Sequence, residues 1–312
     1  MSGVARRLGS ALAGVIASTV FVFVVLRMLP GDIATARLGT NATPEALAAL
    51  REQYGLNRSF FVQYFDWLGT ALRGDLGNSL VTGDSVRAEI FSRLDVTLPL
   101  VVLSSLVAVL VALRVGQHSA LHRKKFSGLL AGALSQLGFA VPTFVVGVGL
   151  IFLFAVRFRL LPAGGFPTDG WTQFVEATRS MVLPVVTLAL AQSAVLVRFA
   201  RSQSLDFLAS DAFRTARAAG RTTDQALSTA TRLVLSPVLT VTALQLSTLL
   251  TGAVVVETVF ALPGVGSMTV RDIANRDVTK VQSTLLVLVI TVFTIRLIIE
   301  TVNDRLDPRR ST

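Results

Sequence analysis

The chain has 312 residues, of which 52% are hydrophobic and only 15% are charged, and its mean hydropathy is +0.65. Soluble domains carry about a quarter of charged residues, so this composition argues against a soluble domain and excludes a disordered chain. The sequence has no cysteine and only two histidines, which excludes a disulfide framework and disfavours a metal or redox enzyme. The net charge of +10 gains meaning only from where the basic residues lie.

Six apolar segments predict an all-α, polytopic membrane protein. Five of them contain at least 18 residues without Asp, Glu, Lys or Arg, and the sixth reaches that length if Arg296 snorkels near a helix end. The third segment is too short for two crossings of about 20 residues each, so we expect one helix, kinked at Pro142. The expected spans are residues 8–26, 96–113, 126–156, 180–197, 233–256 and 281–299.

The basic residues predict the orientation of the spans. An even number of spans places both termini on one side, together with the loops 114–125 and 198–232, and these segments hold 15 basic and 6 acidic residues. The segments on the other side hold 13 basic residues and, apart from Glu257 at the end of the fifth span, 12 acidic residues. By the positive-inside rule both termini are therefore cytoplasmic, and the net charge of the chain does not require a nucleic-acid partner.

The spans divide the chain into four expected parts. They are residues 1–29, the cytoplasmic N-terminus and first span; 30–97, an extracytoplasmic helical segment; 98–303, a five-helix core with the cytoplasmic loop 198–232; and 304–312, a cytoplasmic tail. The first apolar stretch exceeds the roughly 7 to 15 residues of a signal-peptide core, so we expect it to be retained as a span.

Capping signals predict two helices in the extracytoplasmic segment, and an apolar face predicts a third. They run from Pro44 to Tyr54 between Thr43 and Gly55, from Phe60 to Arg73 between Ser59 and Gly74, and from Ser85 to Leu94. The third has Val86, Ile90, Phe91 and Leu94 on one face and is expected to lie along the bilayer. The second carries an aromatic-rich band, Phe61, Tyr64, Phe65, Trp67 and Leu68, which either packs on the span ends or contacts cargo or a delivering protein.

The cytoplasmic loop 198–232 holds the most informative pattern. Apolar and small residues recur at three- or four-residue spacing from Ser204 to Gly220, which predicts an amphipathic helix outside the membrane. Gly220 permits the left-handed backbone that ends such a helix, and Thr222 with Gln225 forms a capping box that opens the next one. A helix that packs only against its own chain would show the same pattern. The apolar stripe consists of Leu205, Leu208, Ala209, Ala212, Ala216 and Ala219.

The segment from Arg214 to Gly220 resembles the EAA-loop motif of ABC importer permeases, in the form used by the dipeptide, oligopeptide and nickel permease family. Other stretches resemble the same family in the same order, so the resemblance extends over almost the whole chain. They are residues 29–32, 54–56, 73–77 with Ser79, 142–144, 183–184, 257–260, 263–266 and 306–308. A single such stretch is weak evidence, but their order relative to the spans makes the set specific.

The resemblance implies a type I ABC importer permease fold and a permease subunit that forms half of a translocation pathway for peptides in a bacterial inner membrane. Nickel or a metal chelate is the alternative cargo. An ion-gradient-driven secondary transporter is a second alternative, disfavoured because the halves show no convincing repeat and only Glu257 lies near a span as an acidic group.

The implied partners are a second homologous permease, ATP-binding subunits as two chains or a fused pair, an extracytoplasmic substrate-binding protein and membrane lipid. The chain itself has no G-x-x-x-x-G-K-[ST] motif, and none of its three lysines follows a glycine. We therefore expect no enzyme activity and no cofactor in this chain, with ATP and Mg²⁺ bound by the partner subunits.

The resemblance also implies which residues act. The expected ATPase-coupling residues are Leu208, Asp211, Ala212, Phe213, Arg214, Thr215, Ala216, Arg217 and Gly220. A candidate gate consists of Glu257, Pro263, Gly264 and Gly266, although the Glu257 carboxylate would also suit a structural role, as an acceptor for the following turn. No catalytic or metal-binding residue is expected.

For three further ionisable side chains the sequence favours structural or surface roles over ligand binding. His118 and His122 flank a basic loop and are best explained as part of a solvated, lipid-facing cluster. Arg296 is expected to snorkel or to contact another subunit. Gly138, Gly147, Gly149 and Gly252 are expected to allow close contact between helices.

Overall fold

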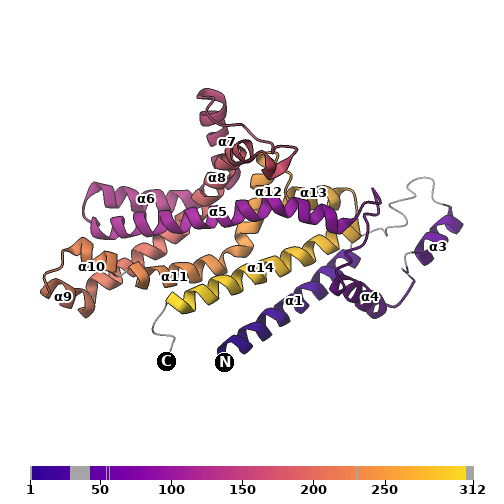
Figure 1. The fold of residues 1–312 in the computed structure, drawn as a ribbon, viewed down its shortest axis with the longest axis horizontal. Helices are drawn as coiled ribbons and strands as arrows, with labels where there is room; N and C mark the ends of the chain where they lie inside the picture. Colours follow the sequence, from indigo (N-terminus) through magenta and orange to yellow (C-terminus); the bar gives the residue numbers. More distant parts are fainter. Residues whose placement is uncertain (1, 29–42, 54, 56, 230, 307–312) are drawn as a thin grey trace. The chain divides into compact units, whose positions relative to one another are not determined.

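The computed structural model describes residues 2–28, 43–53, 55, 57–229 and 231–306. Its described elements are helices (Figure 1), and the described connections contain one isolated β-bridge, between Asn78 and Ser85. The all-α prediction is therefore confirmed. The expected motif at residues 29–32, the motif residues Tyr54 and Leu56, and the tail motif from residue 307 onward lie outside the described residues.

Four described helices are long and apolar enough to cross a membrane, and they correspond to the first, second, fourth and sixth expected spans. They are α1 (Ser2–Met28), α5 (Val86–Leu121), α8 (Phe174–Ala209) and α14 (Val278–Leu306). A fifth span results if the bent pair α11 (Thr231–Leu244) and α12 (Leu246–Val259) is counted as one.

The third expected span is not one kinked helix, and that expectation is wrong. It consists of α6 (Phe126–Ala140), α7 (Thr143–Leu150) and a continuing π-helix, η2 (Ile151–Arg157). Pro142 adopts φ −58° and ψ 139°, outside the helical region. Because proline has no N–H and its ring crowds the preceding turn, the helix stops there. Neither piece reaches the roughly 20 residues of a crossing by itself.

The fifth expected span is also divided. The axes of α11 and α12 differ by 61°, and the break lies at Gln245. The Gln245 N–H is shared between the carbonyl oxygens of Val241 and Thr242, at 3.0 and 3.2 Å. Pro237 lies inside α11, away from the bend, so proline does not cause it.

Helix α5 is longer than the second expected span. It begins at Val86, so the separate helix expected from Ser85 to Leu94 is wrong: the segment is the first part of α5. The reason is that one buried face continues through both parts without a change of period. That face consists of Val86, Ile90, Leu94, Thr97, Val101, Ser104 and Ala108.

The first two helices expected between residues 30 and 97 are confirmed as α3 (Pro44–Gln53) and α4 (Phe60–Leu72). Thr43 caps α3, because its Oγ1 accepts a hydrogen bond from the Ala46 N–H at 3.2 Å. Gly55 and Gly74 have φ of +62° and +83° where these helices end, as expected of stop signals. Ser59 makes no side-chain cap on α4, so that part of the prediction is wrong.

The aromatic band of α4 divides into two groups. Tyr64 and Trp67 pack on Phe23 of α1, with ring centroids 5.3 and 6.0 Å apart, and the Tyr64 hydroxyl is 2.9 Å from Thr19 Oγ1. Packing on a span is therefore confirmed for these two rings. Phe61 and Phe65 are exposed, and a contact of these two with cargo or a delivering protein stays a prediction.

The chain forms two compact units, residues 1–95 with 267–294, and residues 96–266 with 295–312. The core of the second unit lies between α5, α8 and α11, which contribute Ala108, Ala112, Leu196, Ala200, Val234 and Val238.

Glycine permits close packing in the second unit. A Cβ on Gly252 would lie 3.0 Å from Leu188, and one on Gly138 or Gly147 would lie 3.2 Å from Ala194 or Phe260, but Gly149 has no such neighbour within 4 Å.

Candidate functional site

The expected coupling residues gather on a short helix, α9 (Asp211–Ala218), at one end of the second unit. The single helix expected from Ser204 to Gly220 is wrong, because α8 ends at Ala209 and Ser210 is extended, with ψ 158°. The Ser210 hydroxyl then caps α9 by accepting the Phe213 N–H at 3.3 Å. Sequence reasoning missed this cap, although a serine followed by an aspartate is an ordinary helix start.

The end of α9 and the start of the next helix follow the prediction. Gly220 has φ +81°, and the Arg221 N–H donates to the Ala216 carbonyl at 3.2 Å. The Thr222 N–H donates to Gln225 Oε1 at 2.9 Å, and the Gln225 N–H donates to Thr222 Oγ1 at 3.2 Å. This reciprocal capping box opens α10 (Thr223–Thr229), so the expected order of helix, glycine and helix is confirmed.

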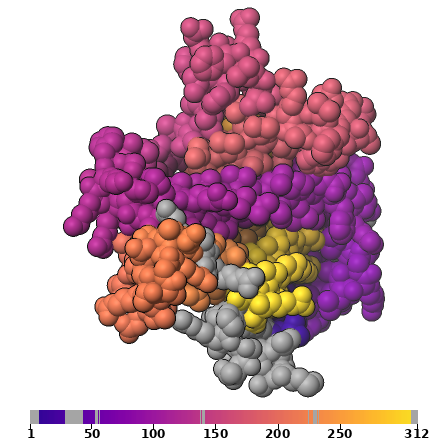
Figure 2. Space-filling model, turned by 60° about the vertical axis from the view of Figure 1, so that its left-hand side comes forward, coloured from indigo at the N-terminus to yellow at the C-terminus, as the bar shows by residue number. Residues whose placement is uncertain are grey.

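Most of α9 is accessible. None of its residues is buried, and it packs against α8 and α10. Phe213 is half-buried with its ring 5.9 Å from that of Phe207, while Ala212 is exposed. Figure 2 shows the segment that includes α9 and α10, in orange, at the surface of the molecule. Exposed on it are Asp211, Ala212, Arg214, Thr215, Arg217 and Gly220, whereas Leu208 and Ala216 are half-buried.

The charged side chains of α9 are exposed and accessible to a partner protein. Arg214 and Asp211 form an ion pair of 2.9 Å with side chains that are 75% and 91% exposed. Such a pair contributes little to folding, so both groups remain available for a partner. The Arg217 guanidinium donates to the Arg221 carbonyl and closes the turn that follows the helix.

The candidate gate is a buried cluster at the other end of the second unit, where α12 ends (Figure 1). Glu257 is fully buried, and its Oε1 accepts a hydrogen bond from Thr97 Oγ1 at 2.7 Å. The same Thr97 oxygen accepts the Val265 N–H at 2.9 Å. Thr97 thereby connects the carboxylate to the start of α13 (Val265–Ala274).

The other gate residues surround this carboxylate. A Cβ on Gly264 would overlap the Glu257 carboxylate, and one on Gly266 would lie 3.0 Å from its Oε2. Glycine is therefore required at both positions by space. Pro263 is half-buried in the same connection. The sequence brought Glu257 and the glycines to attention, but Thr97 was missed because it lies 160 residues away in the chain.

A second buried polar cluster, in the first unit, was not anticipated. Lys280 Nζ lies 2.7 Å from Glu89 Oε2 and 3.1 Å from Asp272 Oδ1, and the lysine is 5% exposed. Burial raises the pKa of the Asp272 carboxyl above its ordinary value, against the opposing effect of the Lys280 ammonium. Nearby Asp277 accepts hydrogen bonds from the Ser79 hydroxyl and the Leu80 N–H. The cluster ties the segment before α5 to α13 and α14 within this unit.

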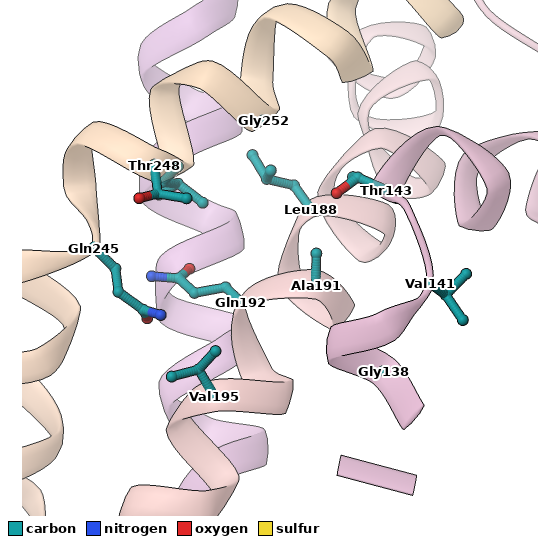
Figure 3. Close-up of a pocket in the computed structure, with 11 residues that line it drawn as sticks. Gly138, Val141, Thr143, Leu188, Ala191, Gln192, Val195, Gln245, Thr248 and Gly252 are labelled. Atoms are coloured by element: carbon teal, nitrogen blue, oxygen red, sulfur yellow. The ribbon is translucent and has the colours of Figure 1, made fainter. Parts of the chain in front are cut away.

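A cavity of about 200 Å³ lies in the second unit between α6, α7, α8, the bend at Gln245 and α12. Two glutamines, Gln192 of α8 and Gln245 at the bend, are among its lining residues (Figure 3). Gln192 is buried. Sequence reasoning did not single out either residue, because a lone glutamine in an apolar segment has no motif.

The two histidines and Arg296 each have a partner within the chain. Within the residues that the structure describes there is no group of three or more His, Asp or Glu side chains that could hold a metal ion. The rings of His118 and His122 stack at 4.3 Å, and His118 Nε2 is 3.3 Å from Ser127 Oγ. Arg296 pairs with Glu300 at 2.8 Å.

Comparison with known proteins gives a consistent result. Residues 97–312 match the family model described as binding-protein-dependent transport system inner membrane component, and residues 1–101 match the model of its N-terminal part. A probable peptide ABC transporter permease protein of Sinorhizobium fredii is 33% identical over 309 residues, which cover 97% of both chains. A glutathione transport system permease protein of Salmonella typhimurium is 33% identical over 306 residues, 98% of this chain and 97% of the relative.

Proposed function

This chain belongs to the family of binding-protein-dependent transport system inner membrane components, and on that premise we propose that it forms half of a pathway that imports peptides. The family supplies the membrane component of ABC importers, so this chain is a permease and not the ATP-hydrolysing subunit. The peptide cargo is supported by the names of the relatives, which are peptide and glutathione transport permeases matched over nearly their full length.

The proposed topology has six spans with both termini in the cytoplasm of a bacterial cell and the chain in its inner membrane. Residues 126–157 form the third crossing, with α6 and α7 as its two parts. Residues 30–97 are extracytoplasmic, 98–303 form the permease core, and 304–312 are a cytoplasmic tail. The basic loop at residues 123–125, between α5 and α6, lies toward the same end of the second unit as α9 and α10 (Figure 1), which is consistent with the positive-inside rule.

Four kinds of partner complete the transporter. A second permease of similar fold supplies the other half of the pathway, ATP-binding subunits carry ATP and Mg²⁺, and an extracytoplasmic binding protein delivers the peptide. Membrane lipid surrounds the spans. The exposed rings of Phe61 and Phe65 on α4 offer an apolar surface to the delivering protein.

The coupling element in this proposal is α9 with the following Gly220. An ATPase subunit binds the exposed face of α9, and closure of the ATPase pair moves α9 and the helices connected to it. A ligand shifts a conformational equilibrium only through contacts that differ between the two states, and α9 is where ATP makes that difference. At the other end of the unit, Glu257 with Pro263, Gly264 and Gly266 forms the outer gate, whose closed state is held by the hydrogen bond to Thr97.

The observation that carries the coupling role is that α9 is almost entirely exposed although it is firmly capped at both ends. Replacement of exposed Ala212 by tryptophan tests it. The larger side chain meets no buried residue of this chain, but it would prevent close docking of a partner. Overpacking of about 1–3 kcal/mol corresponds to roughly 5- to 150-fold weaker coupling. We expect peptide uptake and the stimulation of ATP hydrolysis by loaded binding protein to fall, with normal membrane insertion.

The matched control is Ser202→Trp, which places the same side chain at an exposed position of α8 outside α9. This control is expected to import peptide like the unmodified chain. Unchanged uptake by Ala212→Trp, or an equal loss in both variants, would contradict a coupling role specific to α9. Failure of the unmodified complex to import any peptide would contradict the proposed cargo.

A further inference from the structure

The cavity of about 200 Å³ in the second unit lies where two spans lose their helical geometry. One wall is the break at Val141 and Pro142, since Val141 and Thr143 both line the cavity. The opposite wall is the bend at Gln245, which also lines it. Inside a membrane, interrupted helices persist only where protein covers them or where they border a polar space. Two interruptions at one cavity therefore indicate a polar space within the permease.

The cavity contains polar groups that the fold leaves without partners. Gln192 is 6% exposed, and neither its Oε1 nor its Nε2 has a hydrogen-bond partner among the residues that the structure describes. The Oε1 of Gln245 is likewise buried without a partner there. Figure 3 shows the two side chains pointing toward one another from α8 and from the bend. A buried carboxamide without hydrogen bonds is costly, so such groups indicate that another molecule completes them.

The remaining lining defines what that molecule can be. Leu188, Val195 and Leu249 are apolar, Thr248 adds a hydroxyl, and none of the described lining residues is charged. A free metal cation or a carboxylate would find no counter-charge here. The cavity is also smaller than the roughly 300–1,000 Å³ of sites that enclose a whole drug-sized ligand, so it accommodates a short part of a longer molecule.

We propose that Gln192 and Gln245, the carboxamide pair, bind a main-chain peptide group of the cargo as it passes through the permease. This inference rests on the proposed peptide import. A carboxamide offers one acceptor and two N–H donors, which complement the N–H and C=O of a peptide group whatever the neighbouring side chains are. The apolar walls contact the cargo side chains without selecting among charges. The pair thus recognises the feature that all peptides share and leaves the choice of sequence to other parts of the transporter.

The test compares two cargos in the complete transporter, reconstituted in vesicles with ATP and the binding protein. The cargos are trialanine and a trialanine that is methylated on the amide nitrogen of its second residue. The methylated peptide lacks one N–H donor. The measured quantity is the ratio of their uptake rates. The preference of the binding protein affects every variant equally, so a change in this ratio between variants reports on the permease alone.

In Gln192→Leu and Gln245→Leu we expect trialanine uptake to fall roughly three- to tenfold, which is the range of one neutral hydrogen bond. The uptake of methylated trialanine should fall less, so the ratio of the two rates should move toward the value of a permease that does not distinguish the two peptides. The matched control is Gln203→Leu, the same change on α8 outside the cavity, which should keep the original ratio. The ratio does not depend on how much complex assembles. If one of the two leucine variants does not assemble, the uptake ratio of the other variant tests the inference.

The outcomes separate the inference from the function on which it rests. If the unmodified complex imports trialanine but both leucine variants keep its ratio, the carboxamide pair does not bind peptide groups and the cavity holds only water, while peptide import stands. If the control shifts the ratio as strongly as the leucine variants do, the effect is not local and the inference is also wrong. If the unmodified complex imports neither cargo, the proposed peptide import fails and the inference fails with it.

Discussion

The substitution Thr97→Val isolates the hydrogen bonds that hold the candidate gate. Valine has nearly the shape of threonine, so it opens no cavity at this buried position, but it removes the oxygen that donates to Glu257 at 2.7 Å and accepts from the Val265 N–H at 2.9 Å. A neutral hydrogen bond contributes about 1 kcal/mol and one to a charged group about 1.5–3 kcal/mol. We therefore expect a loss of about 3 kcal/mol, or roughly 5 °C or more in the melting temperature in detergent.

The conservative variant Thr97→Ser keeps the oxygen and loses one methyl group, which costs about 1 kcal/mol. The assay is thermal unfolding of both purified variants, followed by uptake measurements on the same preparations. If Thr97→Val melts at or above the temperature of Thr97→Ser, the hydroxyl does not stabilise the connection between Glu257 and α13, and the reasoning is wrong. A loss of uptake without a loss of stability would show instead that the hydrogen bond acts during gating.

Two further substitutions use the same thermal assay. Lys280→Met leaves the buried Asp272 carboxylate without its cation, while Glu89, whose side chain is 27% exposed, keeps Arg93 at 3.5 Å, so we expect a loss of about 3 kcal/mol. Arg58→Met, at an ion pair whose side chains are 63% and 59% exposed, should cost at most about 1 kcal/mol; equal melting temperatures would contradict this difference. Gly266→Ala places a Cβ 2.9 Å from the Val254 Cα, which a backbone shift must relieve at about 1–3 kcal/mol, while Gly149→Ala meets no atom within 4 Å. A Gly266→Ala variant as stable as Gly149→Ala would show that the connection can move apart at no cost.

Local signals in the sequence were sufficient wherever a few neighbouring residues determine the backbone. The capping box of Thr222 and Gln225 forms both of its hydrogen bonds, and Gly220 takes the left-handed backbone that ends α9. Thr43 caps α3 in the same way. In each case the partners lie within a few residues of one another, so chain geometry brings them together before any tertiary contact forms.

Helix boundaries inside apolar segments were predicted less well. Hydropathy predicts the position and length of an apolar segment, but it does not show where a helix inside that segment is interrupted. Pro142 was expected to kink a helix and instead ends it, while Gln245 lies at a bend of 61° with no proline or glycine beside it. The joining of residues 86–94 to the second expected span in one helix, α5, likewise depends on one buried face, which only the packed structure reveals.

The partners of the buried polar residues could not be predicted, because they are set by packing between distant segments. Thr97 and Glu257 are separated by 160 residues, and Lys280 meets Glu89 from another helix. Burial of a polar group is unfavourable unless hydrogen bonds or opposite charges compensate it. Glu257 and Lys280 have that compensation within the chain, which gives them a part in holding the fold. Gln192 has none among the described residues, so the same requirement is met from outside the chain, and a peptide group of the cargo is the partner that we propose for it.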